Sequence, residues 1–342
     1  MLRAVLQSPR RPLTPVYGED FPDPFLLVVG DARGPGGHPR NRYFAYGTQT
    51  GDINVQVMES ADLAGWEHRG DALPELPPWA VRGRTWSPAA LLRGDTRGQG
   101  GVPRADCVLY YAVRLEAAGR QCISVATAAD PAGPFADRSE GPLIFQADRG
   151  GSIDPSPFVD ADGRAYLVWK SDDNAVGGVP SLWGAPLQPD GLGLAGPPVE
   201  LLRQDADWER PLIEAPSLIR TGDGPRGYVL FYSGGWWESE NYAVGYATGA
   251  GPLGPFRKET VEGPWLASEP GMAGPGGAEV FTAADGEWRI AFHAWTPPRI
   301  GYAAAGRRSL WIERLRFDDG RPGQISSSIG PSGPRRAYHS KP

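Results

Sequence analysis

Short apolar segments recur along this chain at a nearly constant interval, separated by turns rich in glycine, proline and aspartate. The strongest segment of each interval is dense in aromatic and β-branched residues, which is typical of β-strands. These segments span residues 42–48, 107–113, 165–170, 227–233 and 288–295. No stretch of helical length shows a convincing 3.6-residue apolar period. The pattern predicts an all-β protein.

A shorter motif precedes each of these segments and sets the period of the repeat. It has an acidic or aromatic residue, then a small residue or proline, then an apolar run. Its copies begin at Asp23, Trp86, Asp154, Glu214 and, most weakly, Gly277. Successive copies are 63, 68, 60 and 63 residues apart, and such regular spacing indicates a structural repeat.

A third apolar segment completes each interval, at residues 54–59, 122–127, 182–187, 242–248 and 309–317. Repeats of this length made only of strands build a radial array of small antiparallel sheets. We therefore expect a five-bladed β-propeller with a central channel over residues 19–325. Residues 1–18 are expected to form an N-terminal extension, and residues 326–342 a C-terminal tail. Two β-sandwiches are the alternative, but they do not explain a constant interval.

Composition agrees with a folded protein and excludes some partners. The 47 glycines and 36 prolines would permit disorder, but 12 Trp, 12 Tyr and 11 Phe supply ample apolar surface to bury. The net charge of −6 and the lack of a long basic run argue against a nucleic-acid partner. No stretch reaches the length of a membrane span, and composition indicates no oligomeric state.

The N-terminal residues and the cysteines bear on the compartment. The first 20 residues contain no apolar core of signal-peptide length, so a cytoplasmic location is expected, or a secreted one if a signal was removed. Cys107 and Cys122 lack the spacing of a metal site. They flank one predicted hairpin, and we expect buried free thiols, with a single disulfide as the alternative.

Three acidic residues share the motif position, in repeats one, three and four. Because the first strand of every propeller blade lines the channel, Asp23, Asp154 and Glu214 are predicted to meet at one mouth. Crowded carboxyl groups cannot all ionise easily, so the pKa of at least one is raised. A protonated acid beside an ionised carboxylate is what acetal cleavage requires. This chemistry needs no metal or organic cofactor.

Antiparallel pairing brings the ends of the second strands to the same mouth. Polar residues there suit a hydroxyl-rich ligand. The predicted substrate-binding residues are Gln49, Arg114, Lys170, Ser233 and His293, together with the aromatic residues Trp86 and Trp236. Ordinary packing remains the alternative for both tryptophans, and a purely structural role for His293.

These residues resemble family 43 of the glycoside hydrolases, five-bladed propellers that include arabinanases, α-L-arabinofuranosidases and β-xylosidases. The resemblance covers about residues 19–325. It rests on Phe21-Pro22-Asp23-Pro24, Glu59-Ser60-Ala61-Asp62-Leu63 through Trp66, Trp86-Ser87-Pro88, Ser152-Ile153-Asp154-Pro155, Ile213-Glu214-Ala215-Pro216-Ser217, Phe231-Tyr232-Ser233, Gly274-Pro275-Gly276 and Phe292-His293-Ala294-Trp295. Each match is weak by itself, but their order and spacing together are specific.

The resemblance implies an inverting mechanism in which Asp23 is the general base and Glu214 the general acid. Asp154 would orient Glu214 and tune its environment. The counterpart of His293 in such proteins often lies near a channel calcium or a water cluster, so a structural calcium held through water is a possibility. Gly277 departs from the pattern, because relatives commonly have a histidine there, and Ser87 replaces the commoner alanine.

The predicted function is hydrolysis of terminal arabinofuranose, or xylose, residues from plant-cell-wall-derived oligosaccharides, with α-L-arabinofuranosidase as the leading interpretation. A β-xylosidase or an endo-acting arabinanase is the first alternative. A propeller that binds glycans without cleaving them is the second. A related phosphorylase is a third, which Arg114 and Lys170 would favour by holding phosphate.

Overall fold

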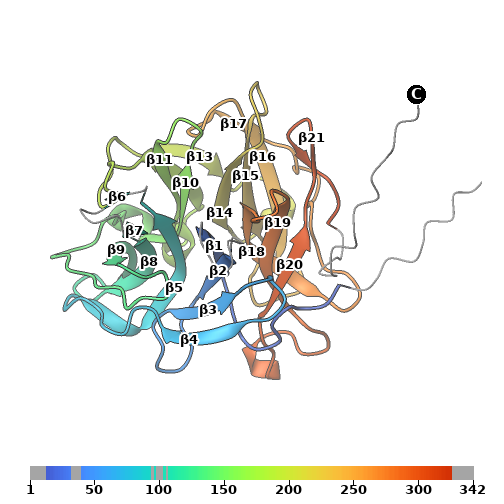
Figure 1. Cartoon of the computed structure of the whole chain (residues 1–342). Coiled ribbons are helices and arrows are strands. Elements are labelled where there is room, and N and C mark those ends of the chain that lie inside the picture. Colours follow the sequence, from blue (N-terminus) through green and yellow to red (C-terminus); the bar gives the residue numbers. More distant parts are fainter. Residues whose placement is uncertain (1–12, 32–39, 94–95, 98–102, 105–106, 326–342) are drawn as a thin grey trace, which may run out of the picture.

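The computed structural model describes residues 13–31, 40–93, 96–97, 103–104 and 107–325. Its strands form five main antiparallel sheets arranged radially around one axis, as Figure 1 shows. The innermost strands are β1 (Phe25–Asp31), β5 (Ala80–Leu92), β10 (Ser152–Val159), β14 (Ile213–Arg220) and β18 (Ala273–Thr282). Each contacts the next, and β18 contacts β1, so the ring closes. The predicted all-β, five-bladed propeller is confirmed.

The remaining strands complete each blade in chain order. Blade one adds β2 (Arg40–Gly47), β3 (Gln56–Ser60) and β4 (Glu67–Asp71), and blade two adds β8 (Cys107–Leu115) and β9 (Arg120–Ala128). Blade three adds β11 (Ala165–Ser171), β12 (Ser181–Pro186) and β13 (Val199–Arg203). Blade four adds β15 (Tyr228–Gly234), β16 (Ala243–Gly249) and β17 (Phe256–Lys258), and blade five adds β19 (Trp288–Trp295) and β20 (Ser309–Arg314).

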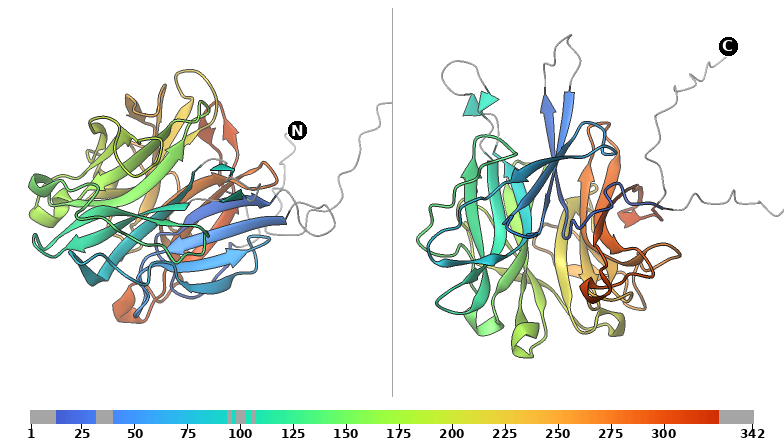
Figure 2. Two further views of the ribbon diagram at one scale, coloured as in Figure 1. Left: turned by 60° about the vertical axis from the view of Figure 1, so that its left-hand side comes forward. Right: turned by 90° about the horizontal axis from the view of Figure 1, so that it is seen from below.

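Short elements decorate the blades. Two small hairpins pair β6 (Thr96–Arg97) with β7 (Pro103–Arg104) and β21 (Phe317–Asp318) with β22 (Arg321–Pro322). The 3₁₀ turns are η1 (Ala147–Arg149), η2 (Asp173–Val176), η3 (Asp207–Glu209) and η4 (Tyr302–Ala304). Figure 2 shows the far ends of β1 and β2 and the β6–β7 hairpin projecting from one side of the molecule. Among the described residues, no helix is long and apolar enough to cross a membrane.

The core lies between the blades. Successive residues of a strand point to opposite faces, so each blade packs on both neighbours. In β2, Phe44 and Tyr46 pack toward blade two, whereas Tyr43 and Ala45 pack toward blade five. The described residues form one such apolar cluster at each of the five blade junctions. This two-sided burial explains why the second strands are apolar along most of their length.

The N-terminal segment packs on blade five. Leu310 of β20 accepts a hydrogen bond from the Val16 amide at 2.9 Å and donates one to the Tyr17 carbonyl at 3.0 Å. Phe21 is fully buried between blades five and one. The described part of the predicted extension, residues 13–18, therefore contacts the propeller, while residues 1–12 and the predicted tail at 326–342 lie outside the described residues.

Four of the innermost strands have a bulge of one extra residue at an equivalent place near the cavity. In β14, Glu214 pairs with Ser233 and Ser217 with Phe231, so three steps on one strand match two on the other. The same bulge occurs in β5, β10 and β18. In each of these four strands, the residue directly after the last paired residue before the bulge has a positive φ. These residues are Ser87, Asp154, Ala215 and Gly277, and Asp23 has a positive φ in blade one.

The predicted equivalence of the motif residues is therefore wrong by one position in two blades. Asp23 and Asp154 share the left-handed position, whereas Trp86 and Glu214 precede it. The bulge itself is common to these strands; the offset arises because the motif matches residues by type, and in blades two and four the aromatic or acidic residue stands one position before the left-handed one, which is Ser87 or Ala215. Glu214 reaches the same mouth from the preceding position.

Both cysteines are buried, and no disulfide joins them, as the sequence analysis expects. On the β8–β9 hairpin, Cys122 pairs with Val113, whereas Cys107 pairs with Ala128. Val113 and Cys107 lie six residues apart on β8, which corresponds to roughly 20 Å of strand. This register keeps the two sulfurs too far apart to form a disulfide.

Candidate active site

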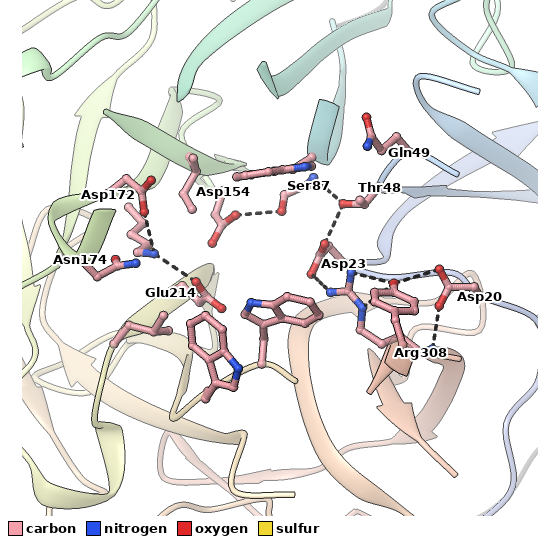
Figure 3. Close-up of a pocket in the computed structure, with 17 residues that line it drawn as sticks. Asp20, Asp23, Thr48, Gln49, Ser87, Asp154, Asp172, Asn174, Glu214 and Arg308 are labelled. Carbon is pink, nitrogen blue, oxygen red and sulfur yellow. Dashed lines mark hydrogen bonds and ion pairs between the residues drawn. The ribbon is translucent and has the colours of Figure 1, made fainter. Parts of the chain in front are cut away.

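A cavity of about 590 Å³ opens at the mouth where the innermost strands begin. Asp23, Asp154 and Glu214 all line it, so the structure brings the three predicted acids together (Figure 3). Asp154 and Glu214 are buried, and Asp23 is partly exposed. A narrow channel of about 40 Å³, which Asp23 and Asp154 also line, runs toward Glu279.

Asp23 is held from both its backbone and its side chain. Its amide donates to Nδ1 of His293 at 3.0 Å, and its Oδ2 accepts from the Thr48 hydroxyl at 2.7 Å. The guanidinium of Arg308 lies 3.6 Å from Oδ1. Positive φ is unusual outside glycine but is tolerated best by Asp and Asn. These contacts aim the carboxylate into the cavity.

A line of hydrogen bonds connects Asp23 to Asp154. The Thr48 hydroxyl, which donates to Asp23, accepts from the Ser87 amide at 2.9 Å. The Ser87 hydroxyl donates to Asp154 Oδ1 at 2.8 Å, and the Ala215 amide donates to Oδ2 at 2.9 Å. Both oxygens of Asp154 are thus fixed, one of them by the residue that directly follows Glu214.

Asp154 has the clearest electrostatic perturbation of the three acids. Burial, reinforced by the negative charges of Glu214 and Asp23, raises its pKa to about 7, although Lys170 opposes the shift. The Asp154 carboxyl therefore changes its charge near neutrality. Perturbed carboxyl groups in a cavity are typical of acid–base sites.

Glu214 has a partner on each oxygen. Nζ of Lys170 lies 3.1 Å from Oε2, and the Tyr242 hydroxyl donates to Oε1 at 2.9 Å. Lys170 also contacts Asp172 at 3.3 Å. Burial opposes the charge of this lysine, but Glu214, Asp172 and Asp154 outweigh it and raise the Lys170 pKa. The acid is thereby positioned by a buried cation and a phenol.

The second group of polar residues lies on the Asp23 side of the cavity. Arg308 is buried and bonds the Tyr302 hydroxyl through Nε and Nη2, at 3.1 and 3.0 Å. That hydroxyl donates to Asp20 at 3.0 Å, and the Arg308 guanidinium stacks over Trp237 at 4.8 Å. This cluster places a fixed positive charge beside Asp23 (Figure 3).

Four of the predicted substrate-binding residues line the cavity, namely Trp86, Gln49, Lys170 and Trp236. The Gln49 carboxamide is already bonded to the backbone of blade two, through Gly83 and Thr85. The charge of Lys170 is matched by Glu214 and Asp172. Of the four, the two tryptophans present the larger apolar surfaces to a ligand.

The other three predicted binding residues, Arg114, Ser233 and His293, are not among those that line the cavity. Arg114 lies two residues past Ala112, the β8 residue that pairs with Trp86. Ser233 is fully buried and accepts a hydrogen bond from the Gly277 amide at 2.9 Å. His293 is likewise fully buried and acts on Asp23 from behind.

The residues around His293 do not form a calcium site by themselves. Burial, together with the nearby Arg308, lowers the His293 pKa well below its usual value, so the imidazole is neutral. Its Nδ1 accepts from Asp23, and its Nε2 has no hydrogen-bond partner among the described residues. Calcium prefers six to eight oxygen ligands, and the described residues contain no cluster of three or more His, Cys, Asp or Glu suited to a metal.

The sequence analysis did not single out several residues of the site. Thr48 stands beside the predicted Gln49, and Ser87 beside Trp86, so the repeat pointed to their neighbourhood. Tyr242 and Arg308 directly precede third strands, where no pattern distinguishes them. Only the packing of blades four and five brings them to Glu214 and Asp23.

Comparison with known proteins identifies the family. The sequence profile described as "Glycosyl hydrolases family 43" matches residues 13–322. The chain belongs to this family. It is therefore a glycoside hydrolase with the propeller fold of its relatives, as the sequence motifs predict.

Individual relatives show how widely the fold is used. A thermostable family-43 glycoside hydrolase is 27% identical, with a TM-score of 0.73 over 97% of this chain and 99% of its own. An endo-1,4-beta-xylanase from Bacteroides thetaiotaomicron is 25% identical, with a TM-score of 0.70 over 93% and 97%. The "Probable arabinan endo-1,5-alpha-L-arabinosidase B" of Aspergillus fumigatus is 25% identical, covering 73% of this chain and 74% of its own.

Proposed function

We propose that this protein is an inverting glycosidase that removes terminal arabinofuranose, or xylose, residues from oligosaccharides. Asp23 is the general base, Glu214 the general acid, and Asp154 the residue that orients and tunes Glu214. The observation that carries this proposal is the meeting of the three acids in one cavity, with Thr48 and Ser87 linking Asp23 to Asp154.

In the proposed reaction, Asp23 takes a proton from a water molecule as the water oxygen attacks the anomeric carbon. Glu214 gives its proton to the glycosidic oxygen as the bond from that oxygen to the anomeric carbon breaks. Attack opposite to the leaving group inverts the configuration. Solvent then removes the proton from Asp23 and returns one to Glu214.

Asp154 supports this cycle electrostatically. It bonds the amide of Ala215 and so fixes the backbone next to Glu214. Its charge changes near pH 7, so the field at Glu214 changes in the working range. The reaction requires no metal or organic cofactor, because proton transfer by the two carboxyl groups supplies the catalysis.

The substrate class is proposed from the family and its named relatives. An arabinofuranoside is our first choice, and a xyloside the second. Endo-acting arabinan hydrolysis is a further candidate, favoured by the name of the Aspergillus fumigatus relative.

The roles of the two acids are separable by leaving group. A fluoride leaves without protonation, so Glu214→Gln should retain most turnover of a glycosyl fluoride and lose at least about 100-fold on the matching oligosaccharide. Asp23→Asn should lose both activities, because water activation is needed in each case. Rates and product anomers are measured by NMR.

Two results would contradict this assignment. Retention of anomeric configuration would exclude inversion, and full oligosaccharide activity of either variant would remove that residue from its role. Glu287→Gln, an exposed carboxylate outside the cavity, serves as the control and should match wild type.

A further inference from the structure

Trp236 is the exposed tryptophan of this protein. It is 45% exposed, whereas the other eleven tryptophans are buried or half-buried. Its only aromatic neighbour among the described residues is Trp237, with ring centroids 5.8 Å apart. An indole that stays in water does not contribute the favourable free energy that burial of its apolar surface would give. An exposed aromatic face inside a functional cavity indicates a ligand surface.

The loop that carries Trp236 is held in place rather than free. The Ser239 hydroxyl donates to the Trp236 carbonyl at 2.8 Å and accepts from the Asn241 amide at 3.1 Å. Glu238 accepts from the Tyr302 amide at 2.8 Å, which ties the loop to blade five. The indole is therefore presented to the cavity by a pre-organised loop, which limits the entropy lost on binding.

The position of Trp236 relative to Glu214 indicates which part of a substrate it meets. The loop follows β15, whose Ser233 pairs directly with Glu214 in the same blade. Leu212, which precedes Glu214 by two residues, also lines the cavity. Asp23, Arg308 and Asp20 form the charged wall on the other side (Figure 3). Leu212 and the Trp236 loop thus belong to the blade that carries Glu214, whereas Arg308 lies beside Asp23.

Asn174 faces the same part of the cavity from blade three. It lines the cavity near Glu214 and Asp172 in Figure 3, and its Oδ1 has no hydrogen-bond partner among the described residues. A carboxamide oxygen without a donor is costly unless a ligand or water supplies one. This oxygen is itself shielded from solvent, but the residue lines the cavity, where the carboxamide nitrogen can donate to a sugar hydroxyl.

We propose that Trp236, Leu212 and Asn174 form the binding site for the leaving group, and that this group is a sugar residue. The inference rests on the proposed function, because a general acid at Glu214 marks the leaving-group side of the scissile bond. The C–H face of a sugar ring packs on the indole and on Leu212, and its hydroxyl groups bond the Asn174 carboxamide.

The test compares two substrates that share the same glycone, arabinofuranose or xylose. One carries a sugar as leaving group, and the other carries fluoride, which cannot contact Trp236. Trp236→Ala should lower kcat/KM for the oligosaccharide roughly 10- to 100-fold and change that for the fluoride less than about twofold. Trp236→Phe should recover most of the loss, because it restores an aromatic face.

Two further variants sharpen the comparison. Asn174→Ala should show the same selectivity with a smaller loss, about 3- to 10-fold, as expected for one hydrogen bond. Val261→Ala removes an exposed apolar side chain outside the cavity and should leave both substrates unaffected. Oligosaccharide binding to each protein is measured in parallel by calorimetry, which does not depend on turnover.

The outcomes separate this inference from the proposed function. An equal loss on both substrates in Trp236→Ala overturns the leaving-group site and leaves the hydrolase proposal intact. A wild-type protein that cleaves neither substrate, but binds the oligosaccharide more tightly than Trp236→Ala does, retains a sugar site at Trp236 and contradicts the hydrolase proposal. Absence of both cleavage and binding overturns both.

Discussion

At the scale of single residues, the mouth of the channel is built from strained backbone. Asp23, Ser87, Asp154 and Ala215 all have positive φ, which side-chain-bearing residues rarely adopt. Such strain costs of order 1–3 kcal/mol per residue and concentrates at functional sites. Here it turns each chain so that carboxyl groups and amides converge on one cavity. The fifth position is Gly277, with φ of 58°.

Gly277→Ala should damage the site through contact as well as strain. An added Cβ would lie 2.7 Å from Nδ1 of His293 and 3.1 Å from Oδ1 of Asp23. We expect the free energy of unfolding to fall by at least about 2 kcal/mol and kcat/KM to fall at least about tenfold, because the proposed base is displaced. Chemical denaturation and steady-state kinetics measure the two effects.

Gly286→Ala is the matched control for this substitution. Gly286 has a similar positive φ of 80°, but nothing lies within 4 Å of the added Cβ. The free energy of unfolding of the Gly286→Ala variant should fall by about 1 kcal/mol because of backbone strain, and its activity should not change. Equal behaviour of the two variants would mean that contact with His293 and Asp23 is unimportant. As long as His293 holds Asp23 in its observed position, a Cβ at position 277 would collide with both residues, so only glycine fits there.

At the scale of the strand, the innermost strands combine an active-site end with a channel-lining segment. Beyond each bulge lies a second ring of side chains that includes Ser156, Ser217 and Glu279. Glu279 interacts with both serines, and burial raises its pKa to about 8. The proposed reaction does not use this carboxyl group, so its effect should be on stability.

Glu279→Gln should make stability less sensitive to pH. The pKa of the Glu279 carboxyl group is higher in the folded protein than in the unfolded chain. The protonated group therefore contributes its full stabilisation of the fold below about pH 4.5, and this contribution is lost as the pH rises through about 8. Glutamine cannot ionise, so the free energy of unfolding of the variant, relative to that of wild type, should increase between pH 5 and pH 9. Glu279 is only half-buried, so the expected gain is about 1–2 kcal/mol.

Thermal melts of the two proteins across this pH range test the prediction. The exposed Glu287, in the turn before β19, supplies the control Glu287→Gln, which should follow wild type. Parallel melting curves for wild type and Glu279→Gln would show that the channel carboxyl group is not titrating in the folded protein. The other titrating groups are common to both proteins and cancel in the comparison.

At the scale of the whole molecule, stability depends on contacts between blades and on closure of the ring. Blade five has three strands of its own, β18–β20, and the N-terminal segment binds its outer edge. Tyr17 also reaches blade one, where its hydroxyl lies 2.6 Å from Nε2 of His68. The segment thus joins the first and last blades, which are neighbours in the ring.

Removal of residues 1–18 should weaken this closure. The truncated protein loses the Val16 and Tyr17 hydrogen bonds to Leu310, the His68 contact and the bond from the Ser309 hydroxyl to the Gly18 carbonyl. We expect the free energy of unfolding to fall by about 2–4 kcal/mol, seen as a Tm lower by several degrees. Removal of residues 1–12 alone leaves these contacts in place and should have a smaller effect; equal losses would refute the closure role.

The sequence by itself determined the number of blades and most of the strands. Every predicted second strand, such as residues 165–170, agrees with its observed strand to within two residues, because apolar composition and turn residues act locally. The repeat also brought Asp23, Asp154 and Glu214 to one mouth, since equal positions in a closed ring are neighbours. Their roles in the reaction remain predictions.

Tertiary structure alone decided which side chains meet there. Glu214 and Trp86 stand one position before the left-handed residue of their strands, whereas Asp23 and Asp154 occupy it, and the apolar pattern of the sequence does not distinguish the two positions. Arg308 and Tyr242 reach the acids from the segments before third strands, while Arg114 does not line the cavity. Such contacts depend on how neighbouring blades pack and on where each side chain points, and both are set by long-range packing rather than by local pattern.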